Sequence, residues 1–470
     1  MYPTSWDPAT ALLPPVIAPP RTVFVRAPGG QAGSQVNIPP TLPGSKYYTL
    51  RYLLNALLAD GESLVRSPAL SDDTAVLVRA LRALGAQVEW ESLDRSAGWA
   101  LRVRGLAGRP QAPKGSVLSV GNAGAVLRLL LGIGALLPAV RFETDHPESL
   151  GRRPNADLLD ALRALGIAVE ARGPEGLLPI ALAGGPPRGG VVSVSGARSS
   201  QYLSALLYLA PLLPLGLDIT VTDDLRSAPL VRATLRALEE AGIRVEAASN
   251  LRHFSVPGGQ IVQACVYDVP GDGPTAAALA SAALTLRRTL RLERLDGAED
   301  DVRALVDALD RFGAPLIERP GGAGARTLAL GEDAQLHGAR IDGDACIDSV
   351  PALVAAACFA EGESRFERVA TLRLKESDRI ADLCAELARA GCDVEPLADA
   401  IVVRGQPEGI VGGVTVDGHD DHRLVQALAI AAMRSRMGLT ITGAVAVAKS
   451  YPGFFADLAG MGAEVRVLEQ

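Results

Sequence analysis

Basic side chains stand at several points where a turn enters an apolar helix, a position suited to binding small anions. Pro43-Gly44-Ser45-Lys46 precedes the apolar run Tyr52–Ala59. Backbone N–H groups and the helix dipole at such a turn attract a phosphate or carboxylate. Arg51 lies about a turn and a half after Lys46 and could reach the same side. The pattern of a P-loop is absent, so the alternative is an ordinary solvated turn.

Three further turns combine small or polar residues with a following helix. Gly121-Asn122-Ala123-Gly124 precedes a helical apolar run that carries Arg128, and its small residues would let the main chain approach a ligand closely. Arg152-Arg153-Pro154 begins another predicted helix. Ser199-Ser200-Gln201 offers two hydroxyls and an amide to phosphate oxygens. Each motif also has a structural interpretation, as a helix cap or a solvated face.

The densest charged cluster is Lys375-Glu376-Ser377-Asp378-Arg379. The spacing predicts that Lys375 and Arg379 share one face of a helix, with Glu376 held ionised or shuttling a proton beside these cations. The alternative is an exposed ladder of charges. Asp348 stands in a mostly apolar predicted helix, either as a cap or as a general base.

A fourth group is Asp420-Asp421-His422-Arg423, before an apolar helix, with Lys449 in a later apolar stretch. Asp and His together suggest a metal, but no second His or carboxylate group stands at ligand spacing, so we expect no metal site.

A repeated pattern in the chain indicates the elements that would position these residues. A helix-like stretch closes on Gly and continues as an alternating, strand-like run. The pattern recurs six times, at intervals of about seventy to eighty residues. We therefore predict an α/β fold of two domains, each of three such units of strands and two helices, with a ligand cleft between them. The copies are Leu77–Trp90, Leu158–Ala171, Val231–Ala247, Leu305–Glu318, Leu383–Pro396 and Phe454–Val467, and their glycines are Gly85, Gly166, Gly242, Gly313, Gly391 and Gly462.

Composition narrows the class of protein. A chain of 470 residues usually forms more than one domain. The net charge of −7 argues against a general nucleic-acid binder, so any anion site must be local. The five cysteines form no Cys-x-x-Cys pair, which favours buried free thiols in a reducing cytoplasm. The longest apolar stretch, Tyr202–Leu217, contains Pro211 and Pro214 and is too short for a membrane helix, so we expect a buried helix end.

Taken together and in this order, the motifs resemble those of the enolpyruvyl transferase family, and within it the members that use shikimate 3-phosphate as acceptor. The resemblance runs from about Thr22 to the C-terminus. It implies an α/β fold of two similar domains, each of three βαβαββ-type units, with the active site in the cleft between them. It implies that strands near Thr22–Pro40 return to the C-terminal half. The implied organisation is a Pro-rich extension (1–21), a discontinuous domain (22–44 and 269–470) and an inserted domain (45–268).

The resemblance implies transfer of the enolpyruvyl group of phosphoenolpyruvate to the 5-hydroxyl of shikimate 3-phosphate, with release of phosphate, in aromatic amino acid biosynthesis. Asp348 would be the base toward the hydroxyl, Glu376 would exchange the proton at the methylene carbon, and Lys46 would assist. The residues implied for phosphoenolpyruvate are Lys46, Asn122, Gly124, Arg153, Gln201, Arg379, Arg423 and Lys449. Those implied for shikimate 3-phosphate are Lys46, Tyr47, Arg51, Ser199, Ser200, Gln201, Ser227, Asp348, Thr371 and Lys375. No metal or organic cofactor, nucleic acid or membrane is implied, and we expect a cytoplasmic monomer.

Some positions depart from the common pattern of the family. Tyr47 replaces Ser, Leu230 replaces Tyr, and Thr371 replaces Asn or an acidic residue, all on the acceptor side. The alternatives are therefore a transferase with a different acceptor and a degenerate paralogue that binds a phosphorylated metabolite without turnover. Transferases of this family that act on a UDP-amino sugar usually have a reactive Cys in the first half of the chain. Here no Cys precedes Cys265, which disfavours that acceptor. Ala125 and Leu129 also depart, near the expected phosphoenolpyruvate site.

Overall fold

The structure, a computed structural model, describes residues 7–15, 18–27, 42–94, 98–113, 115–321, 326–332 and 335–469. The chain forms two compact units, each with its own hydrophobic core. Unit 1 consists of Met1–Pro15 and Gly44–Val269, and unit 2 consists of Val16–Pro43 and Pro270–Gln470. The chain therefore passes from one unit to the other after Pro15, Pro43 and Val269.

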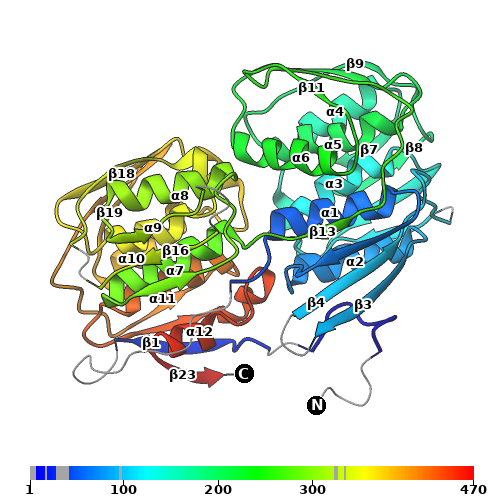
Figure 1. Ribbon diagram of the computed structural model, residues 1–470. Coiled ribbons are helices and arrows are strands. Elements are labelled where there is room, and N and C mark those ends of the chain that lie inside the picture. Colours follow the sequence, from blue (N-terminus) through cyan, green and yellow to red (C-terminus); the bar gives the residue numbers. More distant parts are fainter. Residues whose placement is uncertain are drawn as a thin grey trace. The chain divides into compact units, whose positions relative to one another are not determined.

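Unit 1 is built from three four-stranded sheets with one shared topology (Figure 1). In the spatial order given in the next sentence, the first and second strands of each sheet are parallel. The second and third strands, and the third and fourth, are antiparallel. The sheets are β13 (Val266–Asp268), β2 (Glu62–Arg66), β4 (Gly98–Arg104), β3 (Gln87–Asp94); β5 (Val117–Ser119), β6 (Ala139–Glu143), β8 (Leu177–Ala183), β7 (Ala168–Arg172); and β9 (Gly190–Val194), β10 (Leu217–Val221), β12 (His253–Val256), β11 (Glu246–Ala247).

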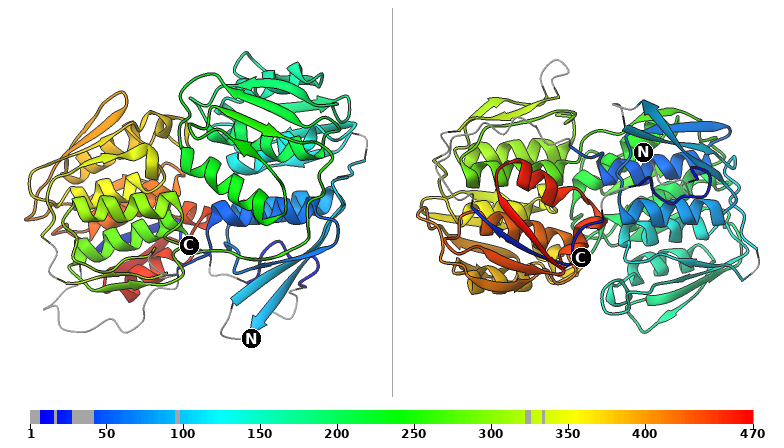
Figure 2. Two further views of the ribbon diagram at one scale, coloured as in Figure 1. Left: turned by 45° about the horizontal axis from the view of Figure 1, so that its top comes forward. Right: turned by 90° about the horizontal axis from the view of Figure 1, so that it is seen from below.

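Unit 2 repeats this topology in two four-stranded sheets and, within the described residues, shows three strands of a third. Its sheets are β21 (Val414–Asp417), β22 (Leu439–Thr442), β1 (Thr22–Arg26), β23 (Glu464–Glu469); β17 (Arg340–Asp342), β18 (Glu363–Glu367), β20 (Ala400–Arg404), β19 (Asp393–Pro396); and β14 (Leu290–Leu292), β16 (Leu328–Leu330), β15 (Leu316–Glu318). The right-hand view of Figure 2 shows the blue β1 beside the red β23, its antiparallel neighbour. The expected return of the N-terminal strand is thus seen for β1, while residues 28–40 of the expected Thr22–Pro40 segment lie outside the described residues.

Two kinds of helix alternate along the chain. The helices of the first kind are buried along almost their whole length: α1 (Lys46–Leu58), α3 (Gly124–Gly134), α5 (Ser200–Leu209), α7 (Gly273–Leu286), α9 (Val350–Ala357) and α11 (His422–Ala432). Those of the second kind bury one face: α2 (Asp72–Ala83), α4 (Ala156–Ala164), α6 (Ala228–Glu240), α8 (Asp300–Arg311), α10 (Ala381–Ala390) and α12 (Phe454–Gly460). The chain order β5-α3-β6-α4-β7-β8 is one complete βαβαββ unit.

The second kind of helix ends as the sequence predicts. Each is followed by a Gly with a positive φ, between 72° and 104°, and then by a strand. Only glycine adopts this conformation without strain, which is why the residue type marks the junction. The predicted α/β fold of repeated βαβαββ units is confirmed. The glycines are Gly85, Gly166, Gly242, Gly313, Gly391 and Gly462.

The Pro-rich N-terminal segment contacts unit 1 where it is described. The main-chain oxygen of Pro8 accepts a hydrogen bond from Trp90 N–H on the outer strand β3 (3.0 Å). The Trp90 indole Nε1–H donates to Leu12 O (3.3 Å). Leu12 and Leu13 pack against the core of unit 1. Residues 7–15 therefore lie along the edge of a sheet, while residues 1–6 and 16–17 are outside the described part of the chain.

The apolar segment Tyr202–Leu217 is the buried end of a helix, as expected. It contains α5, a 3₁₀ turn η2 (Ala210–Leu212) and the start of β10. Within the described residues, we find no helix whose length and hydropathy would let it cross a membrane. The cysteines are free, four of them buried and Cys265 partly buried.

Candidate active site

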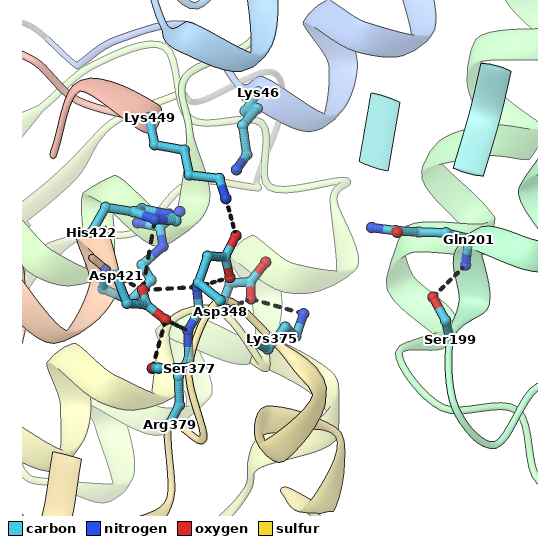
Figure 3. A network of polar contacts seen from close by, with 12 residues as sticks. Lys46, Ser199, Gln201, Asp348, Lys375, Ser377, Arg379, Asp421, His422 and Lys449 are labelled. Atoms are coloured by element: carbon cyan, nitrogen blue, oxygen red, sulfur yellow. Dashed lines mark hydrogen bonds and ion pairs between the residues drawn. The ribbon is translucent and has the colours of Figure 1, made fainter. Parts of the chain in front are cut away.

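A buried arginine of unit 2, Arg379, contacts three carboxylates (Figure 3). Its side chain is 1% exposed. Nε lies 2.7 Å from Asp421 Oδ2, Nη1 lies 2.9 Å from Asp348 Oδ1, and Nη2 lies 2.7 Å from Glu376 Oε2. Burial opposes the charged form, but Asp421, Glu376 and Asp348 outweigh burial and raise the pKa of Arg379 above its usual range. The guanidinium therefore stays charged and fixes all three carboxylates.

Two lysines complete this network. Lys375 Nζ lies 3.0 Å from Asp348 Oδ1, the same oxygen that Arg379 contacts. Lys449 Nζ lies 2.6 Å from Glu376 Oε1. Asp348 and Glu376 are thus each held between a lysine and the shared arginine, which leaves little freedom for either carboxylate to turn.

The segment that carries Lys375, Glu376 and Arg379 differs from its prediction. We expected one helix face, but η4 (Ala370–Leu374) ends before Lys375, and α10 begins only at Ala381. The residues between them form an irregular turn. Asp378 is the physical reason, because its Oδ1 accepts hydrogen bonds from the main-chain N–H groups of residues 380 and 381 and competes with helical pairing. The predicted shared helix face was wrong, although Lys375 and Arg379 do meet at Asp348.

Asp348 also lies outside a helix. It occupies the turn between η3 (Gly343–Cys346) and α9, just before the N-cap residue Ser349. It forms ion pairs with Lys375 and Arg379. The structure therefore supports an electrostatic role for this carboxylate.

The start of α11 supplies the third carboxylate. Asp421 is the N-cap residue, and its Oδ1 accepts from the main-chain N–H of Arg423 (2.9 Å). Ser377 Oγ donates to Asp421 Oδ2 (3.1 Å). With Arg379 on both oxygens as well, Asp421 serves as an anchor and is poorly placed to bind a metal. His422 Nδ1 lies 3.7 Å away, and the described residues contain no cluster of three His, Cys, Asp or Glu suited to a metal ion.

Arg423 and Thr371 are both buried in unit 2. Arg423 is the second residue of α11; its Nη1 donates to Gln426 Oε1 (3.1 Å), and its Nη2 lies 3.9 Å from Asp272 Oδ1. Thr371 lies on η4.

In unit 1, Lys46 is the first residue of α1, and its Nζ lies 3.2 Å from Asp73 Oδ2 on α2. Both side chains are buried. Tyr47 follows at a partly buried position. Lys46 thus brings its positive charge to a helix N-terminus, where backbone N–H groups also favour an anion.

Arg51 ties α1 to α6. Its Nε donates to Thr234 Oγ1 (2.9 Å) and its Nη2 donates to Leu230 O (2.8 Å), both on α6. Nη1 donates to Tyr47 O on its own helix (2.9 Å). Each of the three guanidinium nitrogens thus has a partner within unit 1, so packing of these helices fixes where Arg51 lies.

Gly124 and Arg153 lie against each other. A Cβ atom added to Gly124, the first residue of α3, would lie 2.7 Å from Arg153 Nη1. The absence of a side chain therefore makes room for the guanidinium beside this helix start. Arg153 is buried, whereas its neighbour Arg152 is exposed and pairs with Glu148, so only Arg153 fits a binding role. Asn122 lies in the turn just before α3 and is partly buried.

The predicted serines lie at two helix starts. Ser199 is the N-cap residue of α5 and accepts from Gln201 N–H (3.3 Å; Figure 3), and Ser200 is the first residue of that helix. Ser227 is the N-cap residue of α6 and has a left-handed backbone, with φ of 55°. All three hydroxyls thus stand where helix N–H groups and a phosphate would be close.

Comparison with known proteins decides the family. Residues 31–458 match the family described as EPSP synthase (3-phosphoshikimate 1-carboxyvinyltransferase). The chain belongs to the EPSP synthase family. It is 45% identical over 428 residues to the 3-phosphoshikimate 1-carboxyvinyltransferase of Deinococcus radiodurans, covering 90% of this chain and 93% of that protein. The protein of the same name from Burkholderia pseudomallei is 34% identical over 424 residues, covering 90% and 92%.

Solved structures agree with membership of the EPSP synthase family. The EPSP synthase of Acinetobacter baumannii superposes with a TM-score of 0.76 at 27% identity, covering 95% of this chain and all of that one. The enolpyruvyl transferase NikO of Streptomyces tendae has the same fold, with a TM-score of 0.71 at 16% identity, covering 96% and 99%.

The sequence alone missed two acidic residues and one basic residue at these EPSP synthase motifs. Asp73 pairs with Lys46, and Asp421 pairs with Arg379 across 42 positions of sequence. Arg128 was noted only as part of an apolar helix, yet it contacts two other motifs. Nothing in local spacing signals such pairs, because the partners lie on different helices or turns.

Proposed function

We propose that this chain transfers the enolpyruvyl group of phosphoenolpyruvate to the 5-hydroxyl of shikimate 3-phosphate. The products are 5-enolpyruvylshikimate 3-phosphate and phosphate. Family membership supports the reaction, because the curated relatives carry the name 3-phosphoshikimate 1-carboxyvinyltransferase at up to 45% identity. The reaction belongs to the shikimate pathway and to aromatic amino acid biosynthesis.

One observation in particular supports the chemistry: Asp348 and Glu376 are held by the same guanidinium, and each has a lysine as a second partner. The reaction needs three proton transfers, one at the hydroxyl and two at the methylene carbon. The hydroxyl loses its proton as its oxygen bonds to C2 of phosphoenolpyruvate, and the methylene carbon C3 gains one. In the second step C3 loses a proton, the C2–O bond to phosphate breaks, and phosphate leaves. We assign the hydroxyl proton to Asp348 and the C3 proton to Glu376.

Phosphoenolpyruvate carries a carboxylate and a phosphate, and buried cations of both units suit it. Arginine binds either group through two parallel hydrogen bonds, which are stronger where water is excluded. Gln201, Asn122 and the main chain at Gly124 add uncharged donors. The cations that we assign are Lys46, Arg153, Arg379, Arg423 and Lys449.

For shikimate 3-phosphate, the serines at the N-termini of α5 and α6 are suited to the phosphate. Arg51, Lys375 and Gln201 offer further donors, and Lys46 stands at the N-terminus of α1. Tyr47 and Thr371 are the remaining positions that we assign to this substrate.

The experiment is to incubate the purified chain with both substrates and to measure released phosphate. We expect release only when both are present. Asp348→Ala should abolish turnover yet still bind shikimate 3-phosphate in a calorimetric titration, while Asp160→Ala, at an exposed position of α4, should match wild type. Binding of both substrates without phosphate release would contradict the proposed function, and full activity of Asp348→Ala would remove Asp348 as the base.

We further propose that the reaction needs no metal or organic cofactor and that the chain acts as a cytoplasmic monomer. The free cysteines suit a reducing compartment. Turnover should be unchanged by EDTA, and size-exclusion chromatography with light scattering should give the mass of one chain. Loss of activity in EDTA, or twice that mass, would contradict these proposals.

A further inference from the structure

The buried Arg128 on α3 connects three separate motifs of unit 1. Its Nη1 donates to Gln201 Oε1 (2.9 Å) and lies 3.4 Å from Ser199 Oγ. Its Nε donates to Asn155 Oδ1 (3.3 Å), and its Nη2 donates to Pro154 O (3.2 Å). The side chain thus contacts the Ser-Ser-Gln motif, and it also contacts the turn that follows Arg153.

An aromatic ring restricts the orientation of this guanidinium. Arg128 lies over the ring of Tyr202, with Cζ 5.2 Å from the ring centroid. The Tyr202 hydroxyl donates to Pro154 O (2.6 Å), the same oxygen that Arg128 contacts. A planar guanidinium that stacks on a ring and donates from all three nitrogens has one orientation available to it.

This orientation fixes which end of the Gln201 amide is presented to a ligand. Because Arg128 is a donor only, it must contact the carbonyl oxygen Oε1, which turns the NH₂ group Nε2 to the other side. Within the described residues Nε2 donates to no protein atom. The ionised carboxylate and phosphate oxygens of the substrates only accept hydrogen bonds, so they can be bound by Nε2 and would be repelled by Oε1.

We propose that Arg128 is a positioning residue: it holds the Gln201 amide as a donor toward the anionic substrate, without touching that substrate itself. The inference rests on the proposed function, in which Gln201 binds substrate. It adds a residue that the sequence motifs alone do not assign. Without Arg128 the amide is free to rotate by half a turn and to offer its oxygen instead.

A double-mutant cycle on kcat/KM tests this coupling, with Arg128→Met, Gln201→Ala and the combined variant. Each single change removes the same donor from the substrate, so each should lower kcat/KM by about tenfold, mainly through KM. The kcat/KM of the combined variant should be no more than about twofold below that of the less active single variant. Arg163→Met, at an exposed arginine of α4, is the matched control and should equal wild type. Independent losses that multiply in the combined variant would overturn the inference.

Arg128→Lys guards against loss of folding. It keeps the positive charge but cannot bridge Gln201 and Pro154 with one rigid group, so it should fold with a near-normal melting temperature and still show raised KM. Wild-type kinetics for Arg128→Lys would overturn the proposed role of the fixed guanidinium.

A readout that needs no activity separates this inference from the proposed function. In ¹⁵N TROSY spectra, the side-chain amide signal of Gln201, assigned by its loss in Gln201→Ala, should shift in Arg128→Met and stay in place in Arg163→Met. An unshifted signal contradicts the Arg128–Gln201 contact. If the signal shifts but wild type releases no phosphate, the proposed function fails while the contact stands. If wild type is active and the cycle is multiplicative, the positioning role alone fails.

Discussion

Gly124→Ala is a small change whose effect can be worked out from the contact between α3 and Arg153. The new methyl group would lie 2.7 Å from Arg153 Nη1, 3.4 Å from Leu150 Cδ1 and 3.7 Å from Arg153 Cζ. Heavy atoms in contact prefer about 3.5–4.0 Å, so the guanidinium must move by roughly 1 Å. Leu150 and the arginine Cζ sit at ordinary contact distance, and the end of the arginine side chain is therefore the part that gives way.

The expected cost falls on binding and not on folding. A misplacement of about 1 Å of a group that positions substrate costs up to about 100-fold in rate. We expect KM for phosphoenolpyruvate to rise by about 10- to 100-fold, with the free energy of unfolding changed by less than about 1 kcal/mol. The Gly124 backbone has no positive φ, so alanine adds no backbone strain at this position.

The assay is phosphate release at saturating shikimate 3-phosphate with phosphoenolpyruvate varied, alongside a thermal melt. Gly460→Ala is the matched control, because Gly460 ends α12 and a Cβ there would meet no atom within 4 Å. It should leave KM unchanged and add up to about 1 kcal/mol of stability. In an Arg153→Ala background, Gly124→Ala should have little further effect, since the displaced group is gone.

An unchanged KM in Gly124→Ala would refute the reasoning, because the guanidinium would then either not move or not bind phosphoenolpyruvate. A tenfold loss that persists in the Arg153→Ala background would show that the methyl group acts on another part of the site.

Three other predictions concern stability. Arg379→Met leaves the fully buried Asp421 without its ion pair, so the free energy of unfolding in urea should fall by about 3–5 kcal/mol. Adding Asp421→Asn should restore part of this loss. A loss below about 1 kcal/mol would contradict the proposed ion-pair network. Burial first, then the charges of nearby acidic groups, raise the pKa of Asp301 from 3.8 to about 7. A raised pKa means that the folded state binds more protons than the unfolded state. The contribution of Asp301 to the free energy of unfolding is therefore fully present below about pH 4 and is lost as the pH rises through 7. The loss is at most about 4 kcal/mol, because this side chain is partly exposed. Asp301→Asn should flatten urea midpoints over this range, and an unchanged pH slope would contradict the assignment. Deleting residues 1–15 removes two main-chain acceptors of Trp90 and should lower the free energy of unfolding by about 1–3 kcal/mol. The emission of Trp90 should shift to the red. An unchanged spectrum would show that the segment does not pack against Trp90.

Local backbone preferences made much of the fold predictable. The glycines that end α2, α4, α6, α8, α10 and α12 all adopt positive φ, and the motifs at Lys46, Gly124 and Ser199 all stand at helix starts. Such features depend on residues within a few positions of each other, which a pattern in one sequence can reveal.

The turn at residues 375–380 was not predictable in the same way. Its charge spacing suits a helix, but the Asp378 side chain accepts from the main chain and delays α10 until Ala381. The outcome depended on competition between a side-chain cap and helical pairing, which spacing does not resolve.

The sequence by itself determined the βαβαββ repeats, the family and the chemical types of the candidate site residues. Only the tertiary structure decided which partners the buried charged groups have: Lys46 pairs with Asp73, Arg379 pairs with Asp421, and Arg128 donates a hydrogen bond to Gln201. These partners lie on different helices or turns and meet only when those elements pack. A buried charge must find a partner once water is removed, and packing, not sequence spacing, determines which partner is near.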